Sequence, residues 1–348
     1  MTNFESEEVS GLKEFLDSTG ALLDGRELAE RMDRDGYLFL KALLPREVLE
    51  SLRIRFLEII LDAGWVRADV PLSDGLADLD GFCVEPEPEY MEVYHRMYSL
   101  PEFHEIQHHP NLVEMFERML GEAVLPHPRL IGRTIFPQRE AFTTPPHQDF
   151  IPIQGTPDTY TAWFPLTDVP LQLGGLQIAA GSHRSGVYDF RPALGAGGLE
   201  VLDPLDGTWV GSPFEQGDVL IFHSMAVHKG LPNTSSRLRM SMDARYQKGS
   251  DPIAPGSLKP HSQPCTWEEI YADWPAESRR YYWENLDLEI VEYDTQYHEK
   301  RDQMAFEMAE QGDETARSAL QRILGRDSDP DKQKRATELI AKLDETAN

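Results

Sequence analysis

Hydrophobic and polar positions change their spacing several times along this chain. Residues 45–64 place apolar side chains three and four positions apart, with Pro45 in the first turn and Gly64 just past the end. This pattern predicts a helix with one buried face. A second helix is predicted over residues 110–121, where Pro110 starts it and Gly121 ends it. Between these helices, residues 66–100 are rich in Asp, Glu and Pro, and we interpret them as a loop region.

The middle of the chain, residues 124–247, consists of short apolar runs separated by Gly, Pro and Asn. A further strand and turn are predicted earlier, over residues 36–44. Closely spaced strands with turn residues between them are typical of an all-β sandwich or barrel. The predicted strands cover residues 133–137, 160–169, 175–181, 208–214, 218–224 and 237–247.

Beyond residue 265 the pattern becomes helical again. Residues 314–325 and 330–345 predict an antiparallel helix pair, which either mediates dimerisation or packs against the rest of the chain. We therefore expect a mainly β protein with flanking helices at both ends. The predicted parts are an acidic, partly flexible segment (1–30), a β domain with N-terminal helices (31–250) and a helical C-terminal extension (251–348).

The charge and the cysteine content narrow the range of partners. A formal net charge of −27 repels phosphate backbones and anionic membrane surfaces, so we expect neither nucleic acid nor a membrane as a partner. Cys83 and Cys265 are too few for a disulfide framework. The acidic N-terminus lacks the basic start and apolar run of a signal peptide. These features predict a cytoplasmic protein, either monomeric or a homo-oligomer.

The candidate chemistry begins with His147 and Asp149 in the segment "PPHQDF". In a strand, alternate residues share a face, so an imidazole and a carboxylate would point the same way. An H-x-D pair alone is a weak signal. His228 lies far downstream, in a predicted connection between two strands, and a barrel can bring the two segments together. Two histidines and one carboxylate form the facial triad that leaves open positions on Fe(II).

The last predicted strand, residues 237–247, has one polar and one apolar face. One interpretation is an edge strand with a solvated side. The functional interpretation places Arg239, eleven residues after His228, inside the barrel, where its planar guanidinium binds a carboxylate through two hydrogen bonds. Arg237 shares this face and is the alternative.

Four motifs, "HQD", "GGLQIAAGSH", "GDVLIFHSMAVHKGLPN" and "RLR", occur in order along residues 30–250. Together they resemble the phytanoyl-CoA dioxygenase family of Fe(II)/2-oxoglutarate-dependent oxygenases. The resemblance implies a jelly-roll core, also called a double-stranded β-helix, with helices packed outside it. It also implies that His147, Asp149 and His228 are the iron ligands and that a strand arginine anchors 2-oxoglutarate.

The resemblance assigns further positions around the cosubstrate. Arg239 matches the position of the anchoring arginine, with Arg237 as the alternative. Trp163 matches an aromatic position beside 2-oxoglutarate, although packing in the core explains a tryptophan there equally well. Arg133 matches a position that can line the cosubstrate pocket, and a surface arginine is the other explanation.

The remaining histidines are interpreted as structural or exposed. His183 belongs to a family loop in which it holds a turn. His223 lies on a strand face that turns away from the connection carrying His228. His104, His108 and His109 precede a predicted helix, and we expect them at the surface.

The implied activity uses Fe(II), 2-oxoglutarate and O₂ to abstract hydrogen from a small molecule, with decarboxylation of 2-oxoglutarate to succinate and CO₂. Hydroxylation, desaturation, ring formation and epimerisation all remain open. Two alternatives are a cupin-type metal enzyme that does not use 2-oxoglutarate and a non-catalytic binding protein on the same fold. Residues 66–105 and 186–215 are expected to cover the barrel and to set specificity. The acidic charge disfavours a CoA thioester as substrate.

Overall fold

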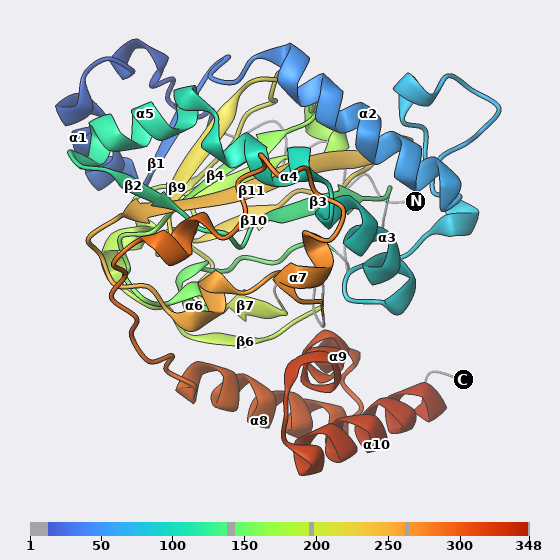
Figure 1. Cartoon of the computed structure of the whole chain (residues 1–348). Coiled ribbons are helices and arrows are strands. Elements are labelled where there is room, and N and C mark those ends of the chain that lie inside the picture. The colour runs from blue at the N-terminus through green and yellow to red at the C-terminus, as the bar shows by residue number, and fades with distance from the viewer. Residues whose placement is uncertain (1–12, 138–142, 195–197, 262–264, 347–348) are drawn as a thin grey trace.

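Antiparallel strands form the centre of the molecule, and helices cover them on the outside (Figure 1). The computed structural model describes residues 13–137, 143–194, 198–261 and 265–346. The strands are β1 (Tyr37–Leu40), β2 (Val124–Pro126), β3 (Ile131–Ile135), β4 (Tyr160–Pro165), β5 (Leu176–Ala179), β6 (Phe190–Pro192), β7 (Leu199–Val201), β8 (Trp209–Val210), β9 (Val219–His223), β10 (His228–Gly230) and β11 (Arg239–Lys248). The α-helices are α1 (Gly25–Asp35), α2 (Arg46–Asp62), α3 (Pro88–Tyr98), α4 (Pro101–Glu105), α5 (Pro110–Leu120), α6 (Phe150–Ile153), α7 (Trp267–Ile270), α8 (Gln296–Glu310), α9 (Arg317–Arg326) and α10 (Pro330–Thr346).

Two antiparallel sheets make up the core. The larger sheet has the order β1-β9-β4-β11-β2, and β3 also pairs with β11. The smaller sheet has the order β10-β5-β8, and β6 and β7 form a separate hairpin. Neighbouring strands in both sheets come from distant parts of the sequence, as in a jelly roll. The predicted mainly β, jelly-roll core with flanking helices is confirmed.

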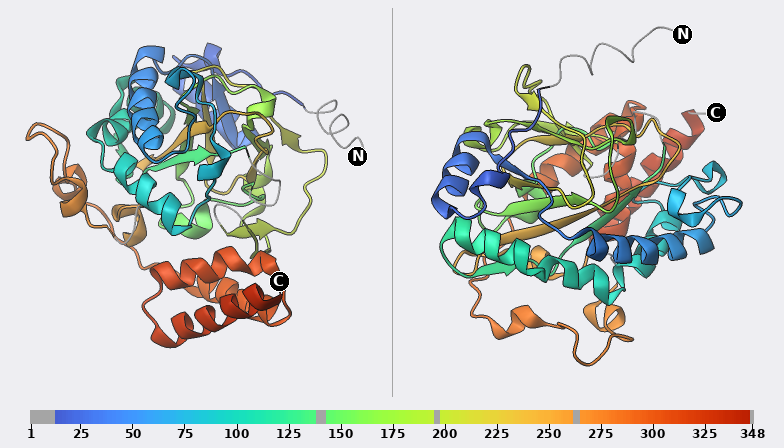
Figure 2. Two further views of the ribbon diagram at one scale, coloured as in Figure 1. Left: turned by 90° about the vertical axis from the view of Figure 1, so that its right-hand side faces the viewer. Right: turned by 90° about the horizontal axis from the view of Figure 1, so that it is seen from above.

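β11 shows how the larger sheet separates the helices from the interior of the barrel. Its even-numbered side chains, including Met240 and Met242, belong to the large hydrophobic cluster that also contains Leu52 and Phe56 of α2. Because successive strand residues alternate between faces, the odd-numbered polar side chains point into the barrel. The helices α1, α2 and α5 lie over the outer face of this sheet, as Figure 1 and the view from above in Figure 2 show. The helices predicted over residues 45–64 and 110–121 are confirmed as α2 and α5.

The prediction of a continuous loop over residues 66–100 is wrong, because α3 lies within it and α4 follows. Both helices have a proline at their first position, where the missing N–H has no partner to lose. Tyr90, Tyr94 and Tyr98 are spaced four residues apart and are all buried on the inner side of α3. These tyrosines, at helical spacing, form the buried stripe of α3. The Pro-rich composition of the segment had indicated a loop instead.

The C-terminal bundle, which we define as α8, α9 and α10, has its own hydrophobic cluster around Phe306, Leu320 and Leu343. It forms a layer below the barrel in Figure 1 and in the left view of Figure 2. The predicted helix pair is confirmed as α9 and α10. The helical expectation is wrong for residues 271–295, where the described chain is mostly irregular. None of the described helices is both long and apolar enough to cross a bilayer.

Candidate metal and cosubstrate site

Main-chain hydrogen bonds bring the two candidate ligand segments together. His147 N donates to His228 O at 2.9 Å, and His228 N donates to His147 O at 3.0 Å. His228 is thus the first residue of β10, so its predicted place in a connection is wrong. The segment does not continue as a strand through Asp149, because the chain turns and Asp149 becomes the N-cap of α6. This turn still leaves its carboxylate facing the histidines.

Gln148, the residue between the two ligands, fixes this turn. Its side chain is buried and donates to Gly186 O at 2.8 Å and to Met225 O at 2.7 Å. Its Oε1 accepts a hydrogen bond from Tyr188 N at 2.9 Å. Because the Gln148 side chain has both donors and an acceptor, it links its own segment to the main chain at Gly186–Tyr188 and at Met225. Nothing in the H-x-D pattern itself indicates this role for Gln148.

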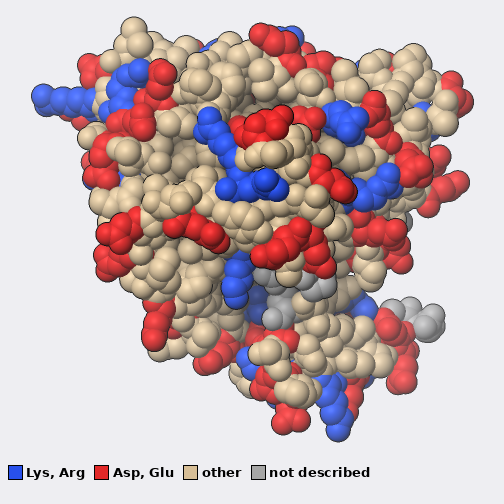
Figure 3. All heavy atoms as spheres, viewed as in Figure 1, with Lys and Arg blue, Asp and Glu red and all other residues tan. Residues whose placement is uncertain are grey.

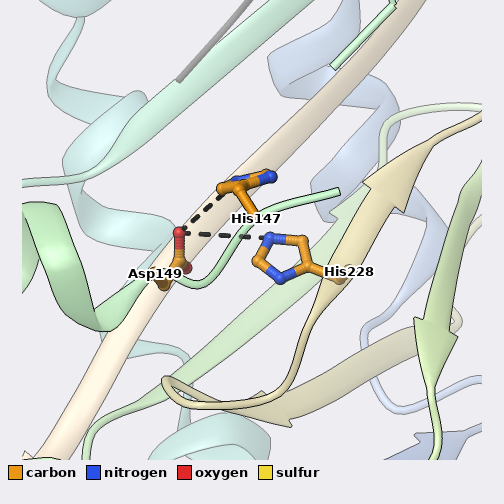
Figure 4. A group of neighbouring side chains, drawn as sticks. All are labelled: His147, Asp149 and His228. Atoms are coloured by element: carbon orange, nitrogen blue, oxygen red, sulfur yellow. Dashed lines mark ion pairs between the residues drawn. The ribbon is translucent and has the colours of Figure 1, made fainter. Parts of the chain in front are cut away.

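The three candidate ligands converge on one point (Figure 4). Asp149 Oδ1 lies 3.9 Å from His147 Nε2 and 4.0 Å from His228 Nε2. One donor atom from each residue lies within 4.8 Å of the others. Ligand atoms bound at about 2.1 Å on one face of an octahedral ion are about 3.0 Å apart, so both histidine Nε2 atoms would move about 1 Å closer to Asp149 Oδ1 to hold one ion. The predicted triad is therefore assembled from its two distant segments.

Hydrogen bonds set the tautomer of both histidines. His147 Nδ1 lies 2.8 Å from Pro145 O, and His228 Nδ1 lies 3.1 Å from Ala226 O. A carbonyl oxygen only accepts, so each Nδ1 carries the proton and donates it. Each Nε2 is left with its lone pair directed toward Asp149, as a metal ligand requires.

Asp149 is held by groups on the side away from the histidines. Its Oδ2 accepts hydrogen bonds from Thr161 Oγ1 at 2.6 Å and from Arg245 Nη2 at 3.3 Å. Burial acts to raise the pKa of Asp149, but Arg245 and the two histidines outweigh it and hold this pKa below its ordinary value. Burial, together with His228, lowers the pKa of His147 to about 3. Both groups are therefore in their metal-binding protonation states at neutral pH.

Arg239 lies on the inward face of β11 and is 4% exposed. It donates through Nη1 to Gly174 O, and its guanidinium lies 6.0 Å from the ring centroid of Trp163. Its Nε and the nearby Ser241 Oγ are buried polar atoms without hydrogen-bond partners. Buried donors left without partners mark a place where a polar ligand fits. The carboxylate of 2-oxoglutarate is chemically suited to this pair of donors.

The alternative anchor, Arg237, precedes β11 and is exposed. Trp163 is 1% exposed and pairs with Asp243 across β4 and β11, with its ring against Phe214. Burial, followed by the charge of Arg133, lowers the pKa of Arg239 to about 10, so its guanidinium remains charged at neutral pH. Of the two arginines, the structure places Arg239 in the barrel.

Arg133 lies on β3 opposite Ser241, and its side chain is 16% exposed. It is therefore not the surface arginine of the alternative interpretation. Its Nη1 donates to Glu85 Oε2 at 2.6 Å, and its Nε lies 3.6 Å from Asp243 Oδ2. Burial acts to lower the pKa of Arg133, but the two carboxylates raise it above its ordinary value.

The other histidines lie apart from the triad. His183 Nε2 lies 3.0 Å from Asp33 O, and His223 Nε2 lies 3.4 Å from Asp158 Oδ1. His108 and His109 are partly exposed. The expectation that His104 lies at the surface is wrong, because α4 packs it against several aromatic rings.

The sequence matches the phytanoyl-CoA dioxygenase (PhyH) family over residues 32–241. The chain belongs to this family. It is 30% identical over 269 residues to the 1-deoxypentalenic acid 11-beta-hydroxylase of Streptomyces exfoliatus, covering 72% of this chain and 90% of that protein. It is 31% identical over 258 residues to the enzyme of the same name from Streptomyces arenae, covering 69% of this chain and 87% of that protein.

Two solved structures are also similar. The non-heme monooxygenase ThoJ has a TM-score of 0.48 and 18% identity, over 90% of this chain and 99% of that chain. The epimerase SnoN in complex with Fe3+, alpha ketoglutarate and nogalamycin RO has a TM-score of 0.45 and 20% identity, over 67% of this chain and 86% of that chain.

As a member of the phytanoyl-CoA dioxygenase family with this triad, the chain is an oxygenase that depends on non-haem Fe(II) and 2-oxoglutarate and uses O₂. This confirms the oxygenase prediction over a cupin-type enzyme that does not use 2-oxoglutarate and over a non-catalytic binding protein.

Proposed function

We propose that His147, Asp149 and His228 bind Fe(II), that Arg239 anchors 2-oxoglutarate, and that the enzyme hydroxylates a small apolar organic acid. The observation that carries the metal assignment is the approach of both histidine Nε2 atoms to Asp149 Oδ1, at 3.9 and 4.0 Å. Two imidazoles and one carboxylate are the ligand set of the facial triad.

When bound, iron and 2-oxoglutarate supply the oxidation of a substrate C–H bond, with O₂ as oxidant and succinate and CO₂ as products. The protein residues position these groups. The Asp149 carboxylate would offset part of the charge of a bound metal, and Thr161 and Arg245 hold its Oδ2 so that Oδ1 faces the two histidines. Arg239 offers its planar guanidinium to the distal carboxylate of 2-oxoglutarate, and the Ser241 hydroxyl adds a second donor.

We assign supporting roles to the other predicted cosubstrate residues. Trp163 is buried beside the Arg239 guanidinium and would form a wall of the cosubstrate site. Arg133 is already paired with Glu85, so it would border the site rather than replace Arg239 as the anchor. Arg237 is exposed and is proposed to have no contact with 2-oxoglutarate.

The substrate class is supported by the relatives. Both Streptomyces relatives are named as hydroxylases of 1-deoxypentalenic acid, and this chain covers 90% and 87% of their lengths. The net charge of −27 favours a free acid over a CoA thioester, whose phosphates need a basic surface. A small apolar acid is therefore the proposed substrate, and hydroxylation is the proposed outcome.

The test combines spectroscopy with product analysis. Under anaerobic conditions, Fe(II) and 2-oxoglutarate added to the protein should produce a weak visible charge-transfer band. His147→Ala and Asp149→Ala should abolish this band, and a panel of apolar acids that includes 1-deoxypentalenic acid should be screened for substrate-dependent succinate release. Normal band formation in both variants would refute the ligand assignment.

We also propose that the enzyme is cytoplasmic, because no disulfide joins Cys83 and Cys265. Cell fractionation followed by immunodetection tests this. Recovery of the protein in an extracytoplasmic fraction would refute it.

A further inference from the structure

The candidate metal ligand Asp149 begins a short helix whose other end is held by the C-terminal part of the chain. Asp149 is the N-cap of α6, and its main-chain oxygen accepts a hydrogen bond from Ile153 N at 3.2 Å. Gln154 is the C-cap, and its N donates to Phe150 O at 2.8 Å. Because α6 has four residues, about one helical turn, the position of Gln154 bears directly on the main chain of Asp149.

Gln154 has a backbone conformation that its residue type rarely adopts. Its φ is 52° and its ψ is −156°, close to a region that essentially only glycine populates. A residue with a side chain keeps such a conformation only where the surrounding structure holds it in place, and such residues cluster at functional sites. The turn at the end of α6 therefore depends on the contacts that Gln154 makes.

The side chain of Gln154 provides these contacts. It is 5% exposed, and its Nε2 donates to Asp294 O at 2.8 Å. Its Oε1 accepts a hydrogen bond from Asp294 N at 2.6 Å. A side-chain amide that pairs with both main-chain groups of one residue fixes its distance and its orientation together. Asp294 lies outside the part of the chain that matches the family, residues 32–241.

The residues around Asp294 make further contacts with α6. Tyr293 Oη donates to Ile151 O at 3.0 Å. The side chain of Ile151 is 1% exposed and packs in a small apolar cluster with Phe190, Leu199 and, at its edge, Tyr297. Tyr297 belongs to the first turn of α8, and α8 packs against β6 (Figure 1). The start of the C-terminal bundle is therefore joined to α6 through both polar and apolar contacts.

We call the hydrogen bonds of Gln154 with Asp294 and of Tyr293 with Ile151 the α6 clamp. Figure 3 shows an indentation between the barrel and the bundle, so the two parts do not pack together over the whole of this face. The α6 clamp, in contrast, joins the chain before the bundle to a residue only five positions after Asp149.

The larger sheet supports Asp149 independently. Phe150 N donates to Ser224 O at 3.0 Å, and Thr161 Oγ1 donates to the Asp149 carboxylate at 2.6 Å. The candidate ligand therefore lies between two supports, one in the barrel and one supplied by the C-terminal part of the chain. Where a binding-competent position depends on two supports, loss of either reduces its population and the apparent affinity with it.

We propose that the α6 clamp positions Asp149 for metal binding, so that docking of the C-terminal bundle and binding of the metal stabilise each other. The inference rests on the proposed function, since it assumes that Asp149 is a metal ligand. Such coupling is reciprocal: if the docked bundle raises the metal affinity tenfold, the bound metal favours the docked bundle by the same factor. Tyr293 and Asp294 are then positioning residues supplied from outside the family match.

The test measures metal affinity and amide hydrogen exchange on the whole chain, by anaerobic titration with Fe(II) or Co(II). In wild-type protein, bound metal should slow exchange in residues 293–298 about tenfold. Gln154→Ala should weaken metal binding about tenfold and abolish this slowing, because both hydrogen bonds to Asp294 are lost. Tyr293→Phe removes only the hydrogen bond to Ile151 O and should weaken metal binding by a smaller factor.

Gln154→Gly separates positioning of the ligand from stability of the fold. Glycine adopts a positive φ without strain, so Gln154→Gly should be more stable to urea than Gln154→Ala. It lacks the same two hydrogen bonds, so its metal affinity should be as weak as that of Gln154→Ala. Recovery of both stability and metal affinity in Gln154→Gly would show that backbone strain alone matters, and would overturn the proposal.

The matched control is Gln107→Ala. Gln107 is also buried and also contacts the C-terminal part of the chain, through Tyr282 Oη at 3.3 Å, but it lies between α4 and α5 in the sequence. This substitution should change neither the metal affinity nor the slowing of exchange. Circular dichroism checks the folding of each variant. If Gln154→Ala does not fold, Gln154→Gly and Tyr293→Phe carry the test.

The outcomes distinguish this inference from the proposed function. Metal binding by wild-type protein without any change of exchange in residues 293–298 overturns the inference alone. Wild-type metal affinity in the folded variants of Gln154 and Tyr293 does the same. Failure of wild-type protein to bind metal overturns the ligand assignment as well, because the triad is then not a metal site.

Discussion

The hydroxyl of Thr161 donates a 2.6 Å hydrogen bond to Oδ2 of Asp149. Thr161 is fully buried on β4, in the middle of the larger sheet. This contact occupies the carboxylate oxygen that faces away from the histidines and directs Oδ1 toward them. A rigid strand thus orients a ligand that itself lies on a turn.

Thr161→Val should weaken metal binding about 10- to 100-fold, because it removes the hydrogen bond that orients Asp149. Anaerobic titration with Fe(II), or with Co(II) as a spectroscopic substitute, measures this affinity. Thr159→Val is the matched control, since Thr159 is also fully buried but donates to Thr156 O. Equal losses in both variants would show that general packing, and not the contact with Asp149, is responsible.

Arg239→Gln should raise the KM for 2-oxoglutarate about 10- to 100-fold, because it removes a charge-assisted pair with the distal carboxylate. Metal affinity measured without 2-oxoglutarate should be nearly unchanged. Steady-state succinate formation at varied 2-oxoglutarate gives the KM. Arg237→Gln is the control and should behave as wild type; the reverse outcome would make Arg237 the anchor.

His104 should make the protein less stable in mild acid. Burial lowers its pKa to about 4, below the ordinary value of about 6.5 in the unfolded chain. Above pH 6.5 neither state binds the proton. As the pH falls from 6.5 toward 4, the unfolded state is protonated first, so the free energy of unfolding decreases, by about 2 kcal/mol at pH 5. Urea denaturation at pH 7.5 and pH 5 should show a smaller difference for His104→Gln. An unchanged difference would contradict this assignment.

Gln154→Ala should loosen the attachment of the bundle near α6. The substitution removes both hydrogen bonds to the main chain of Asp294. Amide hydrogen exchange in residues 293–298 should become about tenfold faster or more. Gln333→Ala, which removes a bond to Asp327 O within the bundle, is the control and should leave this segment unchanged. Equal exchange rates in wild type and Gln154→Ala would contradict the attachment.

The approach of His147, Asp149 and His228 was predictable from the H-x-D pair only together with the downstream histidine and the family motifs, and the alternating pattern of β11 placed Arg239 on its inward face. α2 and α5 were predictable from apolar spacing and from a proline and a glycine at their ends. Local patterns of this kind depend on neighbouring residues alone. They can therefore be recognised without knowledge of the tertiary structure.

Other features depend on distant contacts. β10 has three residues, which is too short for a periodic pattern, so His228 was assigned to a connection. The Thr161 contact with Asp149 requires the register of β4 against the H-x-D segment, and the Glu85 contact with Arg322 joins residues that are far apart in the sequence. No spacing rule connects such residues, so the structure was needed to find them.

The two faces of β11 contact different parts of the molecule. The face with the methionines packs against the helices, and the face with the charged groups lies toward the interior of the barrel. A single inserted or deleted residue near Arg239 would exchange these faces along the following strand. Guanidinium and carboxylate groups would enter the layer beneath α2, and thioethers would face the iron. Substitutions can therefore change the chemistry of this strand, whereas a change in its length would disturb both the packing beneath α2 and the candidate site.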